Sequence, residues 1–219
     1  MFKDVQADSD NMIVEIREFL DFISLHHPQP PITTPRHLNT AKGLIYVQLY
    51  GVIENTVLKT LSKTIDYLNS ESLSLSKLKY SILALVLDNE LNSLINTVSK
   101  KWDKRNDLFL KIKSDDRAII SNTLCPTDGK NIGANQLNSI WRTFELISPI
   151  FSDLTFTGRL RDIVSNRINI AHGNTTASEV GKLVTMADLY TRIQEVSAYC
   201  SHFISAFDGY MQSKEYLNK

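Results

Sequence analysis

Apolar residues recur every three or four positions along most of the chain, and this spacing places them on one face of an α-helix. The first such stripe ends at HHPQPPITTPR (26–36), because proline lacks the backbone N–H and clashes with the preceding turn. The pattern predicts three helices in the first half of the chain, over about 9–26, 37–69 and 74–99.

The middle of the chain breaks this pattern. Residues 100–113, KKWDKRNDLFLKIK, are rich in charge and only weakly amphipathic, and residues 122–135 contain a proline, two glycines and an Asp-Gly turn signal. We therefore expect an irregular insertion over about 100–133. Helical spacing then returns, and a Thr-x-x-Asp capping box at Thr185 marks the start of the last helix. The helices expected in the second half cover about 134–146, 155–172 and the residues from 185 onward.

Together these elements predict an all-α fold, a helical bundle of about five to six helices with one irregular insertion. The chain has 219 residues, which suits a single domain over 1–219 with a sizeable buried core. The sequence contains no internal repeat and no low-complexity tract that would indicate a further unit.

Composition narrows the classes of function. Lys plus Arg and Asp plus Glu both number 24, so the net charge is zero, which argues against coating nucleic acid or an anionic membrane through bulk charge. The longest apolar runs, such as SILALVL, are far shorter than a bilayer span, and the N-terminus lacks the pattern of a signal peptide. Cys125 and Cys200 are expected to be reduced, and the chain is expected to be cytoplasmic with no membrane partner.

One charged residue lies inside the apolar stripe of the 155–172 helix. Because each residue advances about 100° around a helix, Arg167 shares its face with Leu160, Ile163, Val164, Ile170 and Ala171. An unpaired buried guanidinium is too costly to keep, so it needs a carboxylate or phosphate partner. Glu54 is embedded in the same way in the stripe of the 37–69 helix. We expect the two to form an ion pair across the core, and such a pair could be purely structural.

A histidine lies at the end of the same helix. His172 is about 140° around from Arg167, on a polar face with Ser165 and Asn169, and Gly173 follows where a helix often needs a left-handed residue to stop. Histidine can transfer a proton near neutral pH and arginine can bind phosphate, so the two suit phosphodiester cleavage without a metal. Because one Arg and one His so far apart make a poor pocket, we expect a homodimer whose two helix ends share one cleft.

Two motifs resemble a known family. Arg167-Ile-Asn-Ile-Ala-His172-Gly173 resembles the Arg-x4-His signature of the HEPN superfamily, and Tyr50-Gly-Val-Ile-Glu54 resembles the aromatic-x-x-x-Glu of its prokaryotic stand-alone branch, which includes the MAE-like and RiboL-PSP-like members. The helix order, the irregular segment before the motif helix and the long C-terminal helix are also similar. The resemblance spans about residues 10–212.

The resemblance implies a helical bundle and, as in many members, a dimeric, metal-independent endoribonuclease of a toxin, abortive-infection or defence system. Arg167 and His172 would be the catalytic pair, and Glu54 would orient the arginine. RNA would be the substrate, cleaved through its own 2′-hydroxyl. A cognate antitoxin or another defence-system protein would be a further partner, and no cofactor or metal is implied.

One departure from the family pattern defines the alternative. Family ribonucleases usually carry a polar residue directly after the arginine, where this chain has Ile168. Asn169 is the candidate substitute, because it shares the face of His172. The alternative is a catalytically inactive HEPN-like module that binds a partner protein or a nucleotide. Ile168 favours this alternative, and His172 favours the enzyme.

Other basic residues give candidate RNA contacts. Arg159 and Arg161 lie on the motif helix and are placed to guide RNA to the cleft. The basic run from Lys100 to Lys113 also contains two aspartates, so a solvated face is its simpler interpretation. The sequence contains no zinc spacing, nucleophile elbow or dinucleotide fingerprint.

Overall fold

The computed structural model describes residues 1–29, 31–97, 99–122, 124–127 and 131–218. Helices dominate these ranges, which confirms the predicted all-α class. The β-type pairings among the described residues are two isolated bridges, Ser74 with Arg117 and Leu78 with Leu217.

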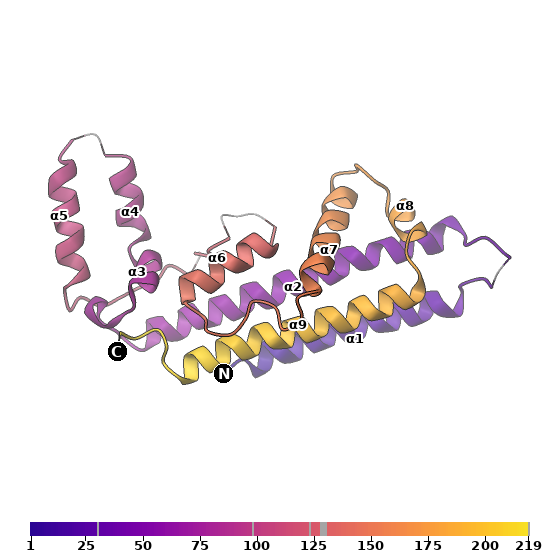
Figure 1. Cartoon of the computed structure of the whole chain (residues 1–219), viewed down its shortest axis with the longest axis horizontal. Coiled ribbons are helices and arrows are strands. Elements are labelled where there is room, and N and C mark those ends of the chain that lie inside the picture. Colours follow the sequence, from indigo (N-terminus) through magenta and orange to yellow (C-terminus); the bar gives the residue numbers. More distant parts are fainter. Residues whose placement is uncertain (30, 98, 123, 128–130, 219) are drawn as a thin grey trace.

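Three long helices run side by side along the molecule (Figure 1). They are α1 (Lys3–Leu25), α2 (Arg36–Ser70) and α9 (Met186–Gln212). Two further helices, α6 (Ala134–Phe144) and α7 (Phe156–Ala171), lie against this layer, and α7 packs on α2. Each of these five was predicted with bounds close to those observed, except that α1 begins earlier than the apolar stripe indicated.

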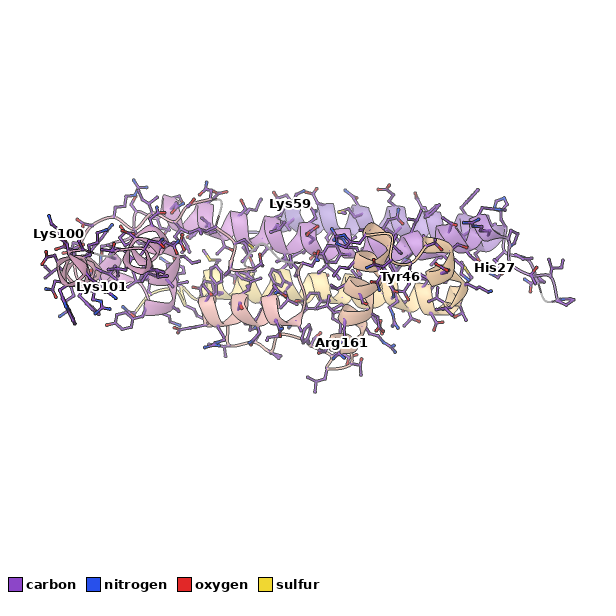
Figure 2. The ribbon with its side chains drawn as sticks, turned by 90° about the horizontal axis from the view of Figure 1, so that it is seen from above. His27, Tyr46, Lys59, Lys100, Lys101 and Arg161 are labelled. Carbon is purple, nitrogen blue, oxygen red and sulfur yellow. The ribbon has the colours of Figure 1, made fainter. Side chains whose placement is uncertain are left out.

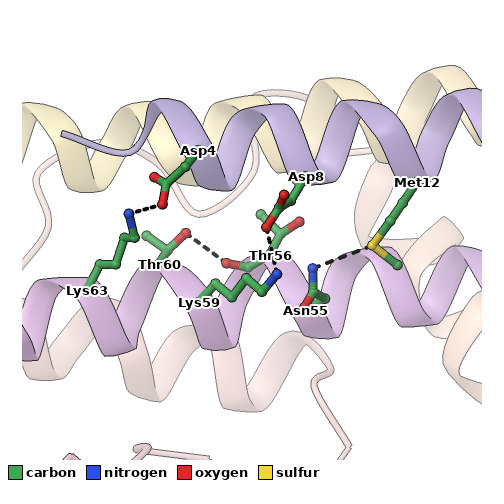
Figure 3. Close-up of polar contacts among 8 residues, drawn as sticks. All are labelled: Asp4, Asp8, Met12, Asn55, Thr56, Lys59, Thr60 and Lys63. Atoms are coloured by element: carbon green, nitrogen blue, oxygen red, sulfur yellow. Dashed lines mark hydrogen bonds and ion pairs between the residues drawn. The ribbon is translucent and has the colours of Figure 1, made fainter.

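Ion pairs line one edge of the α1–α2 contact (Figure 3). Lys59 Nζ lies 2.7 Å from Asp8 Oδ2, and Lys63 pairs with Asp4. Exposed pairs of this kind contribute at most about 1 kcal/mol each. The contact between the two helices therefore depends mainly on the apolar side chains buried beneath these pairs.

Aromatic side chains hold α6 against α9. Trp141 and Phe203 pack edge to face with ring centroids 5.5 Å apart, and Phe144 and Phe207 pack in the same way at 5.1 Å. All four side chains are buried. Because α6 is fixed here, the segment that enters it is held close to α2 and α7.

The predicted single helix over 74–99 is wrong. The chain instead forms three short pieces, η1 (Leu75–Lys77), α3 (Tyr80–Val86) and α4 (Asp88–Ile95). Backbone groups here pair with distant segments: the N–H of Leu75 donates to the carbonyl of Asp116, and the N–H of Lys79 donates to that of Tyr216, both at 3.0 Å. Periodicity reports which face a side chain occupies, so it could not reveal these long-range backbone partners.

The expected irregular insertion over 100–133 is wrong in its first part, because α5 (Lys101–Ile112) is a helix. It packs against α4 as a hairpin that projects from one end of the bundle (Figure 1). Lys104 Nζ reaches across to the hydroxyls of Ser93 and Thr97 at 2.9 and 2.8 Å. Because the α4 side of this contact offers polar groups to α5, α5 packs there without a continuous apolar stripe, which explains its weak amphipathicity.

The rest of that insertion agrees with the expectation where it is described. Residues 113–122, 124–127 and 131–133 carry no helix. The predicted Asp-Gly turn at 128–129 lies outside the described residues. The described ranges hold nine α-helices rather than five to six, because the segment predicted as one helix forms both α3 and α4, and because α5 and α8 (Ala177–Lys182) were not predicted.

The short helix α8 (Ala177–Lys182) was not predicted, although its capping box is present in the sequence. The Thr176 hydroxyl accepts from the N–H of Glu179 at 3.2 Å, and the N–H of Thr176 donates to the Glu179 carboxylate at 2.8 Å. The capping box predicted at Thr185 is confirmed, with its hydroxyl accepting from the N–H of Asp188 at 3.1 Å.

Two remaining expectations concern the membrane and the cysteines. None of the helices in the described part of the chain combines the length and the hydropathy that a membrane span requires. Cys125 and Cys200 are both free, as expected. Cys200 is fully buried, and this burial raises the pKa of its thiol to about 11.

Candidate functional site

The α7 helix ends in a Schellman motif that leaves His172 exposed. Gly173 has φ +71°, a left-handed conformation that glycine adopts without strain. Its N–H donates to the carbonyl of Ile170 at 3.2 Å, and the N–H of Asn174 donates to the carbonyl of Asn169 at 2.9 Å. No described residue hydrogen-bonds the His172 ring, so the imidazole is free to contact a ligand.

Arg167 lies half-buried where α7 meets α2 and the segment that precedes α6. Its Nη1 donates to Asn131 Oδ1 at 3.0 Å, and its guanidinium carbon lies 4.8 Å from the centroid of the Tyr50 ring. A guanidinium has five N–H donors, and a single hydrogen bond joins this one to the described part of the chain. The remaining donors are available to phosphate oxygens.

The expected ion pair between Arg167 and Glu54 is wrong. Both residues are described, and neither an ion pair nor a hydrogen bond joins them. Tyr50 links them instead, because its hydroxyl donates to Glu54 Oε1 at 3.0 Å while its ring lies beneath the guanidinium. Tyr50 precedes Glu54 by one turn on the same face of α2, and helical spacing gives the face but not which of two neighbours meets the partner.

The buried Tyr50 phenol also fixes the segment before α6. Its hydroxyl accepts from the N–H of Ile132 at 3.0 Å, next to the Asn131 side chain that binds Arg167. Burial and the hydrogen bond to the Glu54 carboxylate raise the pKa of Tyr50, so the phenol stays protonated and can donate. Tyr50 thereby holds both the arginine and the segment that flanks it.

Removing the Tyr50 hydroxyl is expected to cost more stability than removing the Glu54 carboxylate. Tyr50→Phe keeps the ring but leaves the buried N–H of Ile132 unpaired, which costs about 1–3 kcal/mol. Glu54→Ala removes the acceptor of the Tyr50 hydroxyl, but the half-buried position that it vacates admits water to accept in its place, so this change should cost about 0.5–1.5 kcal/mol. Urea unfolding of the two variants measures both free energies, and a larger loss for Glu54→Ala would indicate a direct role for its charge at Arg167.

A hollow of about 420 Å³ lies between the start of α6 and α7. Its α7 wall carries Thr157, Arg161, Val164 and Ser165, and its α6 wall is formed by residues 133–136. Figure 2 shows Arg161 pointing away from the long helices, and its side chain is exposed. The hollow therefore has a cation at its edge and begins two residues after the Asn131 that binds Arg167.

The solvent face of α7 connects this hollow to the helix end. Arg161, Ser165, Ile168 and His172 follow one another at intervals of three or four residues, which places them on one face. Three of these side chains are exposed and Ile168 is half-buried. His172 thus lies on the same face of α7 as Arg161, whereas Arg167 lies on a different face and contacts Tyr50 and Asn131.

Arg159 lies on the other side of α7. Its Nε is 3.6 Å from Glu195 Oε1 on α9, and the second oxygen of Glu195 accepts from Arg192 at 2.7 Å. Arg159 and Arg161 therefore face different directions, and RNA contact by either residue stays a prediction. Asn169 is half-buried, and its backbone carbonyl is used by the helix-end motif.

Sequence reasoning missed Asn131, which contacts Arg167. It lies in a segment without periodicity, so no pattern marked it, and only the structure shows that Tyr50 holds this segment in place. Within the described ranges, His, Cys, Asp and Glu side chains form no group of three or more that could hold a metal ion.

Comparison with known proteins identifies the family. The sequence model of the MAE_28990-like HEPN family matches residues 5–216, a region that includes Tyr50, Glu54, Arg167 and His172. No curated protein and no solved structure shows a significant match to the chain. Because the family match extends over nearly the whole chain, the protein belongs to the MAE_28990-like HEPN family.

Proposed function

We propose that this protein is a metal-independent endoribonuclease of the toxin or defence type that acts on RNA in the cytoplasm. The observation that carries the proposal is the end of α7, where His172 is exposed with no hydrogen-bond partner among the described residues and Arg167 makes one hydrogen bond to them. HEPN domains often act on RNA, and the chain is a member of that superfamily. A proton-transfer group and a phosphate-binding group on one helix suit phosphodiester cleavage.

In the proposed reaction the RNA supplies its own nucleophile. The 2′-hydroxyl oxygen attacks the adjacent phosphorus, and the bond from phosphorus to the 5′-oxygen of the next nucleotide breaks. His172 takes the proton from the 2′-hydroxyl or gives one to the departing 5′-oxygen. Arg167 stabilises the negative charge that builds on the phosphate oxygens. The products are a 2′,3′-cyclic phosphate and a 5′-hydroxyl, and no electrons are transferred.

The active cleft is proposed to form between two copies of the chain. Arg167 and His172 diverge by about 140° around α7, so one copy alone cannot enclose a phosphate between them. A two-fold axis near His172 would bring both helix ends together, so that one histidine acts as base and the histidine of the second copy as acid. Ile168 would then lie in the interface, which accounts for an apolar residue on an otherwise polar face.

Light scattering at micromolar concentration is expected to give the mass of a dimer. Ile168→Glu should weaken the dimer at least about tenfold, because like charges would meet across the two-fold axis. Leu25→Glu is the matched control, since Leu25 is exposed at the far end of α1. A monomeric wild type, or equal loss of dimer in both variants, would contradict a cleft at this helix end.

Expression of the protein in a bacterial host is expected to arrest growth, and His172→Ala is expected to relieve the arrest. Cleavage of cellular RNA would stop translation, and loss of the proton-transfer group would slow that cleavage strongly. His37→Ala, an exposed histidine on α2, serves as the control and should remain toxic. Growth arrest that persists in the His172→Ala strain at equal protein level would contradict the proposed activity.

A second function is favoured by one observation. The residue after the motif arginine is Ile168, where family ribonucleases usually have a polar side chain. A catalytically inactive module that binds a partner protein or a nucleotide through the same helix end would retain Arg167 and His172 as ligand contacts. Such a module would bind RNA or a partner without cleaving RNA, so the cleavage assay separates the two functions.

A further inference from the structure

The outer face of α5 carries exposed aromatic side chains that alternate with cations. This face consists of Trp102, Arg105, Phe109 and Lys113, at spacings of three or four residues that place them on one side of the helix. Trp102 is 72% exposed and Phe109 is 67% exposed. The guanidinium of Arg105 lies 4.8 Å from the centroid of the Trp102 ring. This face is not used to pack α5 against the rest of the protein, because α5 packs on α4 through its opposite side.

The charges of α5 are sorted by face. Six of the residues from 100 to 113 are Lys or Arg and two are Asp, which gives +4 in a chain of zero net charge. Lys104 and Lys111 turn toward α4, where they bond to hydroxyls and to Glu90. Asp103 and Asp107 lie about 100° and 140° around the helix from Trp102. The outer face therefore presents aromatic rings and positive charge, and no carboxylate.

The hairpin projects from the end of the bundle at which α2 stops (Figure 1). Figure 2 shows Lys100 and Lys101, which begin α5, at one extreme of the long axis and well away from Arg161 on α7. The outer face of α5 is thus separate from the candidate catalytic face. A ligand that reaches both faces must be extended.

We propose that the outer face of α5 docks single-stranded RNA at a distance from the cleavage site. Trp102 and Phe109 are about 10 Å apart along the helix axis, and each stacks on an unpaired base. Arg105 and Lys113 contact the flanking phosphates. The inference rests on the proposed function for the identity of the ligand as RNA, and it adds a site that holds the strand while another part of it is cut.

Charge and side-chain chemistry favour RNA over a protein partner on this face. Arg105 and Lys113 complement a polyanion, and aromatic rings stack on every base without regard to sequence. A helix that binds an apolar groove presents a run of apolar anchors at i, i+3, i+4 and i+7, whereas every second position of the series on this face carries a cation. The exposed leucine nearest this face, Leu110, lies about 80° around from Trp102 and outside the alternating series.

The test is binding of a fluorescent 12-nucleotide single-stranded RNA to the full-length His172→Ala protein, followed by anisotropy. Adding Trp102→Ala or Phe109→Ala is expected to weaken binding about 5- to 100-fold, and Trp102→Phe should restore most of it. Lys113→Gln should lower the salt dependence of binding. Leu110→Ala is the matched control, because Leu110 is 70% exposed on the same helix and should leave binding unchanged.

The outcomes separate this inference from the proposed catalysis. Equal binding by the Trp102→Ala, Phe109→Ala and Leu110→Ala proteins overturns the docking site, even if the wild type cleaves RNA. Loss of self-association in the Trp102→Ala and Phe109→Ala proteins but not in Leu110→Ala, measured by light scattering and with RNA binding intact, assigns the face to a contact between copies of the chain and also overturns the docking site. Selective loss of RNA binding in the aromatic variants supports the site, even if the wild type proves unable to cleave.

Discussion

Replacing His172 by alanine is expected to lower the rate constant for RNA cleavage by about 10²–10⁴-fold. Without a metal, the 2′-hydroxyl must lose its proton, or the 5′-oxygen must gain one, through a side chain in contact with it. His172 is the histidine that the Schellman motif at the end of α7 holds exposed, and none of the described residues hydrogen-bonds its ring. The measurement is single-turnover cleavage of a labelled RNA at saturating protein.

His172→Ala isolates catalysis better than Arg167→Ala does. The His172 side chain is exposed and has no hydrogen bond to the described part of the chain, so its removal should leave the unfolding free energy within about 0.5 kcal/mol of wild type. Arg167→Ala would also remove the hydrogen bond to Asn131 and the contact with Tyr50. His26→Ala, at the exposed end of α1, is a matched control and should cleave at the wild-type rate. Cleavage by His172→Ala at the wild-type rate would place the active site elsewhere.

Gly43→Ala is expected to destabilise the fold by about 3 kcal/mol or more, at the upper end for overpacked sites. α8 lies so close to α2 that a Cβ on Gly43 would be 1.9 Å from the carbonyl oxygen of Ala177. The contact is reciprocal, since a Cβ on Gly181 would be 1.8 Å from the carbonyl oxygen of Asn39. Backbone atoms cannot rotate away as a flexible side chain can, so α8 must move off α2.

Gly51→Ala gives the matched control on the same helix. No atom lies within 4 Å of the position that its Cβ would take, so the substitution should stabilise α2 by about 0.5–1 kcal/mol. Urea unfolding curves followed by circular dichroism give both free energies. Because α8 begins five residues after His172, Gly43→Ala should also reduce cleavage. Equal stability of the two variants would show that α2 and α8 are not in close contact.

The sequence predicted the helices whose apolar stripes face the core. The bounds of α2, α6, α7 and α9 follow from periodicity and capping because burial itself generates that periodicity. The segment from 74 to 112 was mispredicted. Its first part, before α3, is held by backbone bonds to Asp116 and Tyr216, and α5 packs on a neighbour that offers polar contacts. Neither the long-range backbone bonds nor the polar packing contact produces a recognisable pattern in the sequence of this segment.

The candidate site was predicted in part. Helical spacing correctly placed Arg167 toward the interior and His172 toward solvent, and Gly173 is the helix stop that the sequence indicated. Helical spacing could not show that Tyr50 lies between Arg167 and Glu54. Tyr50 and Glu54 share one face of α2, and spacing does not tell which of the two side chains contacts the arginine on α7. The contact of Asn131 with Arg167 could not be predicted either, because it depends on the hydrogen bond by which the Tyr50 hydroxyl positions the neighbouring Ile132.

The central claim is metal-independent cleavage of RNA through the 2′-hydroxyl, and the chemistry of the new ends tests it most directly. Purified wild-type protein is incubated with a long single-stranded RNA in excess EDTA, and the fragments are analysed by mass spectrometry. The account predicts internal cleavage that leaves 2′,3′-cyclic phosphates and 5′-hydroxyls, and at least about 100-fold slower formation of these products with His172→Ala. Fragments with 3′-hydroxyls and 5′-phosphates, cleavage that requires added Mg²⁺, or intact RNA in every condition would contradict it.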